Sequence, residues 1–300
     1  MNKVIPYLWF DTQAEEAAKF YVSVFKNSRM GDVTRYGPEA ATASGQPEGS
    51  VMLAEFELEG QQFAALNGGP EFKFSPAVSF FVSNGSAVEI DEMWKKLLAG
   101  GKVMMELGKY PFGEKYGWLV DKYGVSWQFY LEEREQKIAP ALMFVGENQG
   151  KAEEAMKFYS SLFKNSGISF MALYDKTMEG PEGKVAHAKF TLDGYELVAF
   201  DSHIQMDYGI TPAISLLINC RTQEEVDEFW ARLSDGGSTE QCGWLRDKYG
   251  VSWQVVPTVL GELMRDKDAA RTERVMKAMI GMTKLDIDAL KRAYDGEAAA

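Results

Sequence analysis

Few side chains of this sequence have the types and spacing that chemistry requires. Its two histidines, His187 and His203, are the residues best suited to bind a metal or to act as a base. The two cysteines, Cys220 and Cys242, form neither a metal-binding spacing nor a disulfide framework. No nucleophile–base pair is visible at a recognisable spacing. His187 therefore stays a candidate site residue, although a lone histidine on an expected strand is more often hydrogen-bonded structure.

Two glutamines hold matching places in a repeated stretch. Residues 117–128 and 243–254 are identical at eleven of twelve positions, with Arg246 in place of Val120. Each copy has an Asp-Lys-Tyr-Gly turn before an aromatic, β-branched run, which predicts a β-hairpin ending on Gln128 or Gln254. A buried glutamine can bind a ligand or can satisfy backbone groups in a filled core, and the pattern leaves both readings open.

Further repeats place these hairpins in two tandem modules. Helical segments recur in the same order, and only the connections between them change length, as in residues 15–28 against 153–166 and 88–94 against 224–230. We expect a first module over 1–135, a second over 138–258 and a helical tail over 259–300. Each module reads as two βαβββ units, so the expected fold class is α+β, with open curved sheets.

Composition limits the partners of the chain. The net charge is −12, so the phosphate backbone of a nucleic acid would be repelled. The sequence contains no apolar stretch long enough to cross a bilayer and no signal-peptide pattern at its beginning, so we expect a cytoplasmic protein without membrane contacts. Strand carboxylates such as Glu55 and Glu57 are expected to be solvated rather than catalytic.

The tail over 259–300 is helical in composition and rich in methionine. Methionines at helical spacing form a core or a docking surface more often than a site for a foreign protein. We therefore expect the tail to pack on the modules or on a second copy of the chain, which makes it a candidate for homo-oligomer formation.

The paired units and their closing hairpins resemble the vicinal oxygen chelate superfamily, which includes glyoxalase, bleomycin-resistance and extradiol-dioxygenase proteins. Four segments are similar to its PhnB-like branch, often described as 3-demethylubiquinone-9 3-methyltransferase-like: residues 6–10, 16–21, 75–80 and 111–113. The resemblance covers residues 3–131 and 138–257 and implies glyoxalase-like modules, each forming an open sheet or half barrel.

The same resemblance implies where a metal would bind, and the residues there do not suit one. The ligand positions of the family fall on Pro6, Ala77 and Gln128 in the first module, and on Pro140, Ala213 and Gln254 in the second. A single glutamine cannot hold a transition metal, so we expect no metal. No glycine-rich strand-to-helix turn suits a nucleoside, so we expect no cofactor.

A small-molecule pocket remains as the expected site. We expect the better pocket in the first module, beneath a lid formed by residues 111–116, with side chains Phe10, Ser79, Phe81, Trp118 and Gln128. The rival site is in the second module, with His187, His203 and Gln254. A filled core at either place is the plain alternative.

These expectations favour a metal-independent protein of the bleomycin-resistance kind that binds a small apolar or aromatic molecule. The alternative is an enzyme of the same superfamily, such as a lyase, an isomerase or the methyltransferase-like activity of its branch. The sequence does not decide between them, nor does it identify the ligand, the working module or the oligomeric state.

Overall fold

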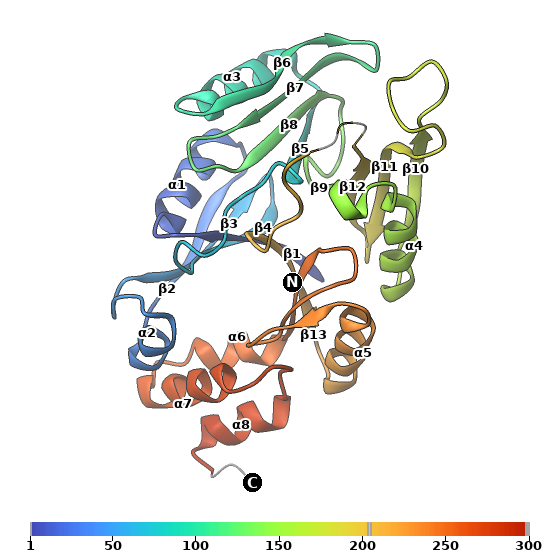
Figure 1. The fold of residues 1–300 in the computed structure, drawn as a ribbon. Helices are drawn as coiled ribbons and strands as arrows, with labels where there is room; N and C mark the ends of the chain where they lie inside the picture. Colours follow the sequence, from blue (N-terminus) through green and yellow to red (C-terminus); the bar gives the residue numbers. More distant parts are fainter. Residues whose placement is uncertain (1, 203, 205, 298–300) are drawn as a thin grey trace.

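Four βαβββ units followed by a helical tail make up the chain (Figure 1). The computed structural model describes residues 2–202, 204 and 206–297. Each unit contains one strand, one helix packed on the sheet, and three further strands. The expected α+β class is confirmed, as is the helical tail.

The first module contributes two units. The first unit consists of β1 (Val4–Phe10), α1 (Ala14–Val24), β2 (Arg29–Arg35), β3 (Val51–Leu58) and β4 (Gln61–Asn67), with α2 (Pro38–Ser44) inserted after β2. The second unit consists of β5 (Val78–Asn84), α3 (Ala87–Leu98), β6 (Lys102–Tyr110), β7 (Gly113–Val120) and β8 (Ser126–Leu131).

The second module repeats this order. Its first unit, the third of the chain, consists of β9 (Ile138–Phe144), the short η1 (Gly146–Asn148), α4 (Ala152–Leu162), β10 (Gly167–Leu173), β11 (Val185–Leu192) and β12 (Tyr195–Asp201). The fourth unit consists of β13 (Ile214–Cys220), α5 (Gln223–Ser234), β14 (Ser238–Thr239), β15 (Trp244–Arg246) and β16 (Ser252–Pro257).

The two sheets combine units from different modules. The sheet that we call the first sheet has the strand order β14-β15-β16-β13-β1-β4-β3-β2, and the second sheet has the order β10-β11-β12-β9-β5-β8-β7-β6. The first unit therefore pairs with the fourth, through antiparallel β1 and β13, and the second pairs with the third, through β5 and β9. Each sheet contains one unit of each module, a partnership that the order of the repeats along the chain does not reveal.

Helices α1, α3, α4 and α5 cover one face of the sheets and form the main core with it. Two of these helices begin with matching caps, because the side chains of Ser86 and Thr222 accept hydrogen bonds from the backbone N–H groups of Glu89 and Glu225. Strand residues alternate between this core and the opposite face, which we call the helix-free face of each sheet.

The repeated hairpins are held from inside by one aspartate each. Asp121 accepts hydrogen bonds from the Tyr21 hydroxyl (2.8 Å), the Trp127 indole (2.9 Å) and the backbone N–H groups of Tyr123 and Val125. Asp247 accepts the same four bonds in the second copy, from Tyr159, Trp253, Tyr249 and Val251. The twelve-residue repeat thus encodes a structural corner in each module.

The tail consists of α6 (Thr258–Met264), α7 (Ala269–Ile280) and α8 (Ile287–Asp295), at the bottom of Figure 1. Helix α7 packs against α2, where the side chain of Met276 is buried beside Tyr36 and Ala40. A second cluster joins the three tail helices to the end of β16 through Val256. The tail thus packs on the modules of its own chain, and no described helix is long and apolar enough to cross a membrane.

Candidate functional site

The helix-free faces of the two sheets are built on the same plan but carry different side chains. Cross-strand partners form a matching row of six residues on each face. In the first sheet the row is Arg246, Ser252, Ser215, Tyr7, Ala64 and Glu55, and in the second it is Val120, Ser126, Ser79, Ala141, Val198 and Lys189. The two faces can therefore be compared position by position.

The face of the second sheet is filled. Its centre is a cluster of buried side chains that includes Ala77, Phe81, Trp118, Ala141 and Val198. Its polar groups satisfy one another: the Tyr116 hydroxyl donates to Gln128 Oε1 (2.7 Å), Gln128 Nε2 donates to Ser79 Oγ (2.8 Å), and Trp118 Nε1 donates to Ser126 Oγ (2.6 Å). This face has the properties of a core.

The corresponding face of the first sheet is open and aromatic. Tyr7 and Trp9 stand where the second sheet has Ala141 and Met143, and both are half-buried. The ring of Trp244 lies edge-on to both, with centroids 6.3 Å from Tyr7 and 5.9 Å from Trp9. Beside them Gln254 Nε2 donates to Ser215 Oγ (3.0 Å). Three half-buried rings thus lie beside the buried amide of Gln254.

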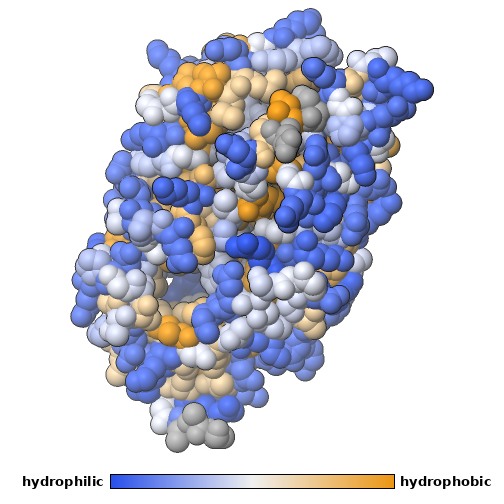
Figure 2. Space-filling view, viewed as in Figure 1, coloured by the Kyte–Doolittle hydropathy of each residue, from blue (hydrophilic) through white to orange (hydrophobic). Residues whose placement is uncertain are grey.

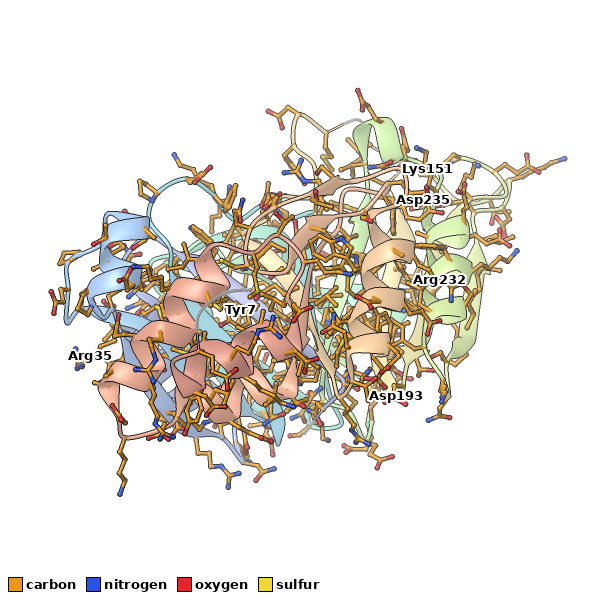
Figure 3. The ribbon with its side chains drawn as sticks, turned by 90° about the horizontal axis from the view of Figure 1, so that it is seen from below. Tyr7, Arg35, Lys151, Asp193, Arg232 and Asp235 are labelled. Atoms are coloured by element: carbon orange, nitrogen blue, oxygen red, sulfur yellow. The ribbon has the colours of Figure 1, made fainter. Side chains whose placement is uncertain are left out.

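The tail forms a roof over this open face. Arg265, at the end of α6, reaches Glu55 on β3 (3.1 Å) and Asp32 on β2 (3.2 Å). Figure 2 shows a hollow in the surface, in the region that Figure 1 shows bordered by α2, the first sheet and the tail helices. Seen from below, the tail helices lie in front of the strand that carries Tyr7, whereas Arg35 lies at the periphery (Figure 3).

The electrostatics keep the Tyr7 hydroxyl protonated. Burial raises the pKa of Tyr7 far above its usual value, and the nearby negative charge of Glu55 raises it further. No hydrogen bond joins the Tyr7 hydroxyl to another described residue. At neutral pH the open face therefore presents a phenol that can donate a hydrogen bond.

The structure separates the residues that the sequence grouped into one pocket. Ser79, Phe81, Trp118 and Gln128 do lie together, on the filled face of the second sheet. Phe10 belongs to the other sheet and points away from both helix-free faces, because its ring packs in the main core against Phe74 (5.0 Å). The placement of Phe10 in that pocket is therefore corrected: Pro6 and Leu8 share its side of β1, and Tyr7 takes the helix-free side.

Two other predicted residues lie apart from each other. Gln254 lies on the open face of the first sheet. His187 lies on the second sheet, with its ring 5.6 Å from Phe81 and 6.1 Å from Phe170. Burial lowers the pKa of His187 to about 4, and the positive charge of Arg134 contributes. The imidazole is therefore neutral at pH 7. His203 lies outside the described residues.

The hairpin predicted as a lid lies beside the residues that the sequence analysis placed beneath it. The β6–β7 hairpin carries Phe112, which stacks on Tyr110 and whose carbonyl accepts a bond from the Tyr130 hydroxyl (2.7 Å). These residues belong to the second sheet, where Tyr110 and Tyr116 pack with the buried cluster of the filled face. The tail, which the sequence marked only as a docking segment, is the element that roofs the first sheet.

The sequence analysis missed Tyr7, Trp9 and Trp244 as site residues. Tyr7 and Trp9 were hidden by the assignment of Pro6 to the inner side of the first strand. A signal was present in the comparison of repeats, since Tyr7 and Trp9 differ in size and chemistry from Ala141 and Met143. Trp244 gave no such signal, because the other repeat has Trp118 at the same position.

The residues of these faces do not fit a transition metal. Among residues 2–202, 204 and 206–297, no three His, Cys, Asp or Glu side chains gather in a metal-binding group. Glu55 is the carboxylate in the row of the first sheet, and it is paired with Arg265. A hard or borderline metal needs several such donors, and these faces do not supply them among the described residues.

The family model for 3-demethylubiquinone-9 3-methyltransferase matches the chain twice, over residues 2–130 and 136–256. The PhnB protein of Bacillus cereus is 41% identical over 42% of this chain and 96% of its own, with a TM-score of 0.39. A protein from Staphylococcus aureus is 30% identical over 44% of this chain and 98% of its own, with a TM-score of 0.19. No curated protein matches the chain.

Glyoxalase I from Zea mays is similar over a larger part of the chain. It is 12% identical over 88% of this chain and 95% of its own, with a TM-score of 0.55, which shows a shared fold. The two family matches cover most of the sequence. The chain therefore belongs to the 3-demethylubiquinone-9 3-methyltransferase family.

Proposed function

We propose that the open face of the first sheet binds a small apolar or aromatic molecule without the help of a metal. The observation that carries this proposal is the contrast between the two faces. The second sheet fills the equivalent space with buried side chains that satisfy one another. The first sheet leaves Tyr7, Trp9 and Trp244 half-buried beneath the tail.

The geometry of the three rings suits an aromatic guest. Trp244 stands nearly perpendicular to Tyr7 (88°) and to Trp9 (85°), so the rings form walls rather than a stack. Burying apolar surface between such walls contributes about 25 cal/mol for each Å² removed from water, and favourable ring contacts add roughly 0.5–1.5 kcal/mol per pair. Gln254 and the Tyr7 hydroxyl supply polar groups that can orient the guest.

The second sheet itself provides the substitutions that test this proposal. Tyr7→Ala and Trp9→Met install the residues that the second sheet carries at the matching positions, so the sheet is expected to tolerate them. Binding of a panel of neutral aromatic molecules, headed by 2-naphthol, is measured by calorimetry. We expect each substitution to weaken binding at least about tenfold, the effect of 1.4 kcal/mol.

The matched control lies on the filled face. His187→Leu installs the residue that the first sheet has there, Leu53, and should leave 2-naphthol binding unchanged. The proposal is wrong if no neutral aromatic molecule of the panel binds. It is also wrong if His187→Leu abolishes binding while Tyr7→Ala and Trp9→Met do not, because the second sheet would then hold the site.

An enzyme of the glyoxalase superfamily is the second candidate, and the Tyr7 hydroxyl is the observation that favours it. A phenol with a raised pKa, beside Glu55, can donate a proton or a hydrogen bond to a bound substrate. Tyr7→Phe separates the two functions, because it keeps the ring and removes the hydroxyl. A binding protein should keep most of its affinity for apolar guests, whereas a lyase, isomerase or methyltransferase that uses Tyr7 should lose turnover.

A cytoplasmic location is also part of the proposal. The two cysteines, Cys220 and Cys242, are free thiols, which suits a reducing compartment. We retain association of two chains through the tail as a proposal as well, although the apolar clusters of the tail already pack within the chain.

A further inference from the structure

Arg246 is the single difference between the two copies of the repeated hairpin, and it lies on the open face. It follows Trp244 by two residues on β15, so both side chains project to the same side of the first sheet. Its cross-strand partner is Ser252, which pairs in turn with Ser215 beside Tyr7. The guanidinium thus belongs to the same face as the aromatic rings.

Two side chains at this end of the open face carry a buried hydrogen-bonding group without a partner among the described residues. Arg246 Nε and Ser252 Oγ are buried and have no hydrogen-bond partner among the described residues. Arg246 also makes no ion pair within the described part of the chain. The second sheet has no such unpaired groups at the matching positions. Val120 replaces the arginine, and Ser126 Oγ accepts a hydrogen bond from the Trp118 indole (2.6 Å).

A buried donor left unpaired costs roughly 1–3 kcal/mol, and more when it is charged. A guanidinium presents a planar set of donors that matches a carboxylate or a phosphate. We infer that the molecule bound on the open face carries an anionic carboxylate or phosphate group, held by Arg246 with the help of Ser252. This inference rests on the proposed function, since it names the chemical class of the ligand for the same site.

The cleft next to Arg246 takes its other lining residues from the β9–α4, β12–β13 and α5–β14 connections and from the β15–β16 turn, and none from Tyr7, Trp9 or Trp244. Arg246 lines a cleft of about 600 Å³, whose wall also carries the Tyr208 hydroxyl, another buried group without a hydrogen-bond partner among the described residues. Three acidic residues line the cleft as well: Asp247 is occupied by its four hydrogen bonds, and Glu147 and Asp207 are exposed. The cleft also contains Lys151 and Lys248, so its formal charges balance.

The net negative charge of the whole chain opposes the binding of an anion. At a net charge of −12, long-range electrostatics disfavour an anion. A preference for an anionic guest must therefore come from local contacts, and Arg246 is the cation of the open face that has no protein partner among the described residues. Added salt should weaken the interaction, because it screens the charge pair.

The experiment compares three probes that share one ring system: neutral 2-naphthol, 2-naphthoate and 2-naphthyl phosphate. Their affinities for the full chain are measured by calorimetry. We expect at least one anionic probe to bind about tenfold more tightly than 2-naphthol. Arg246→Val, which installs the residue of the other copy, should abolish that preference, measured as the ratio of anion affinity to 2-naphthol affinity in the same variant. The two anions distinguish a carboxylate site from a phosphate site.

Arg221→Val is the matched control, because it removes the same charge from an exposed turn and should keep the preference. Thermal melting verifies that both variants fold. The inference is overturned if the wild-type chain binds neither anion more tightly than 2-naphthol, or if Arg246→Val retains the preference. In either case the proposed function still stands when Tyr7→Ala abolishes 2-naphthol binding, whereas failure of all three probes to bind refutes both.

Discussion

At the scale of single residues, the carboxylates of Asp121 and Asp247 explain the strongest repeat in the sequence. Each accepts two side-chain and two backbone hydrogen bonds inside the protein. Burial raises the pKa of both, while the four donors oppose that shift. Eleven identities in twelve residues therefore reflect one hydrogen-bonding corner that is used twice.

Replacing Asp247 with Ala should destabilise the chain strongly. The substitution removes the acceptor of four buried donors: the Tyr159 hydroxyl, the Trp253 indole and two backbone N–H groups. We expect the free energy of unfolding to fall by at least about 3 kcal/mol. Urea denaturation measures this, with the exposed Asp235→Ala as control. An equal, small effect of both substitutions would contradict the structural role of this corner.

His187 should make stability depend on pH. Its folded pKa of about 4 lies below the ordinary value of 6.5, mainly because it is buried and partly because Arg134 is near, while Glu132 opposes the shift. Between these two values the unfolded chain binds a proton that the folded chain does not, so acidification through this window favours unfolding.

The prediction is a difference between two proteins. From pH 7 to pH 4.5 the wild-type chain should lose more stability than His187→Leu, by on the order of 2 kcal/mol. Denaturation curves at several pH values measure this difference. Parallel pH profiles for the two proteins would show that the imidazole is as hydrated in the folded chain as in the unfolded chain.

The sequence was enough to group residues that lie on neighbouring strands of the repeat. It was not enough to decide which side of the first strand faces the core. Ser79, Phe81, Trp118 and Gln128 share a face because their strands are neighbours. Phe10 was assigned to the wrong side because a shift of one residue along a strand exchanges its two faces. Tyr7 lies between Pro6 and Leu8 on the opposite side of the same strand, and it was overlooked for the same reason.

At the scale of elements, apolar spacing and turn residues were enough to predict the helices and strands. They were not enough to predict which strands pair in the sheets. The four βαβββ units are visible in the sequence, because each has its own helix stripe and hairpin. β1 and β5 offer similar edges to β9 and β13, so propensity and pattern do not choose between pairings within a module and pairings across modules. That choice depends on the whole packed structure.

The contact between α7 and α2 should hold the roof of the open face in place. Met276 is buried there beside Tyr36 and Ala40. Met276→Asp places a charge in this cluster and should lower the free energy of unfolding by at least about 2 kcal/mol. Hydrogen exchange should also quicken in α2 and α7.

The exposed Met178→Asp serves as the control for that experiment, because it adds the same charge at a solvated position. Unchanged exchange in α2 and α7 after Met276→Asp would mean that the tail stays in place without this cluster.

At the scale of the whole molecule, the cross-paired sheets bind the two modules into one folding unit. The first module alone, residues 1–135, has no sheet contact between its own two units. Each unit would then expose the strand edge of β1 or β5 that β13 or β9 covers in the full chain. Such edges pair with any available strand.

We therefore expect residues 1–135, expressed alone, to form dimers or larger assemblies and not a folded monomer. Analytical ultracentrifugation over a range of concentrations measures this, and addition of residues 136–300 should produce a one-to-one complex. A stable monomer of 1–135 with native-like circular dichroism would show that the two units can pair within a module. The proposed domain boundaries at 1–135 and 138–258 would then mark independent domains.

The cross-pairing also sets an order of assembly on the ribosome. The second sheet uses residues 78–201, a continuous stretch, and all of its strands are available once β12 has emerged. The first sheet, in contrast, joins β1 to β13, which follows β12 in the chain, and joins β13 in turn to β16. The filled sheet can therefore form during translation, while the first unit keeps an uncovered edge until β13 has been synthesised. The face that we assign to ligand binding is thus assembled later than the filled face.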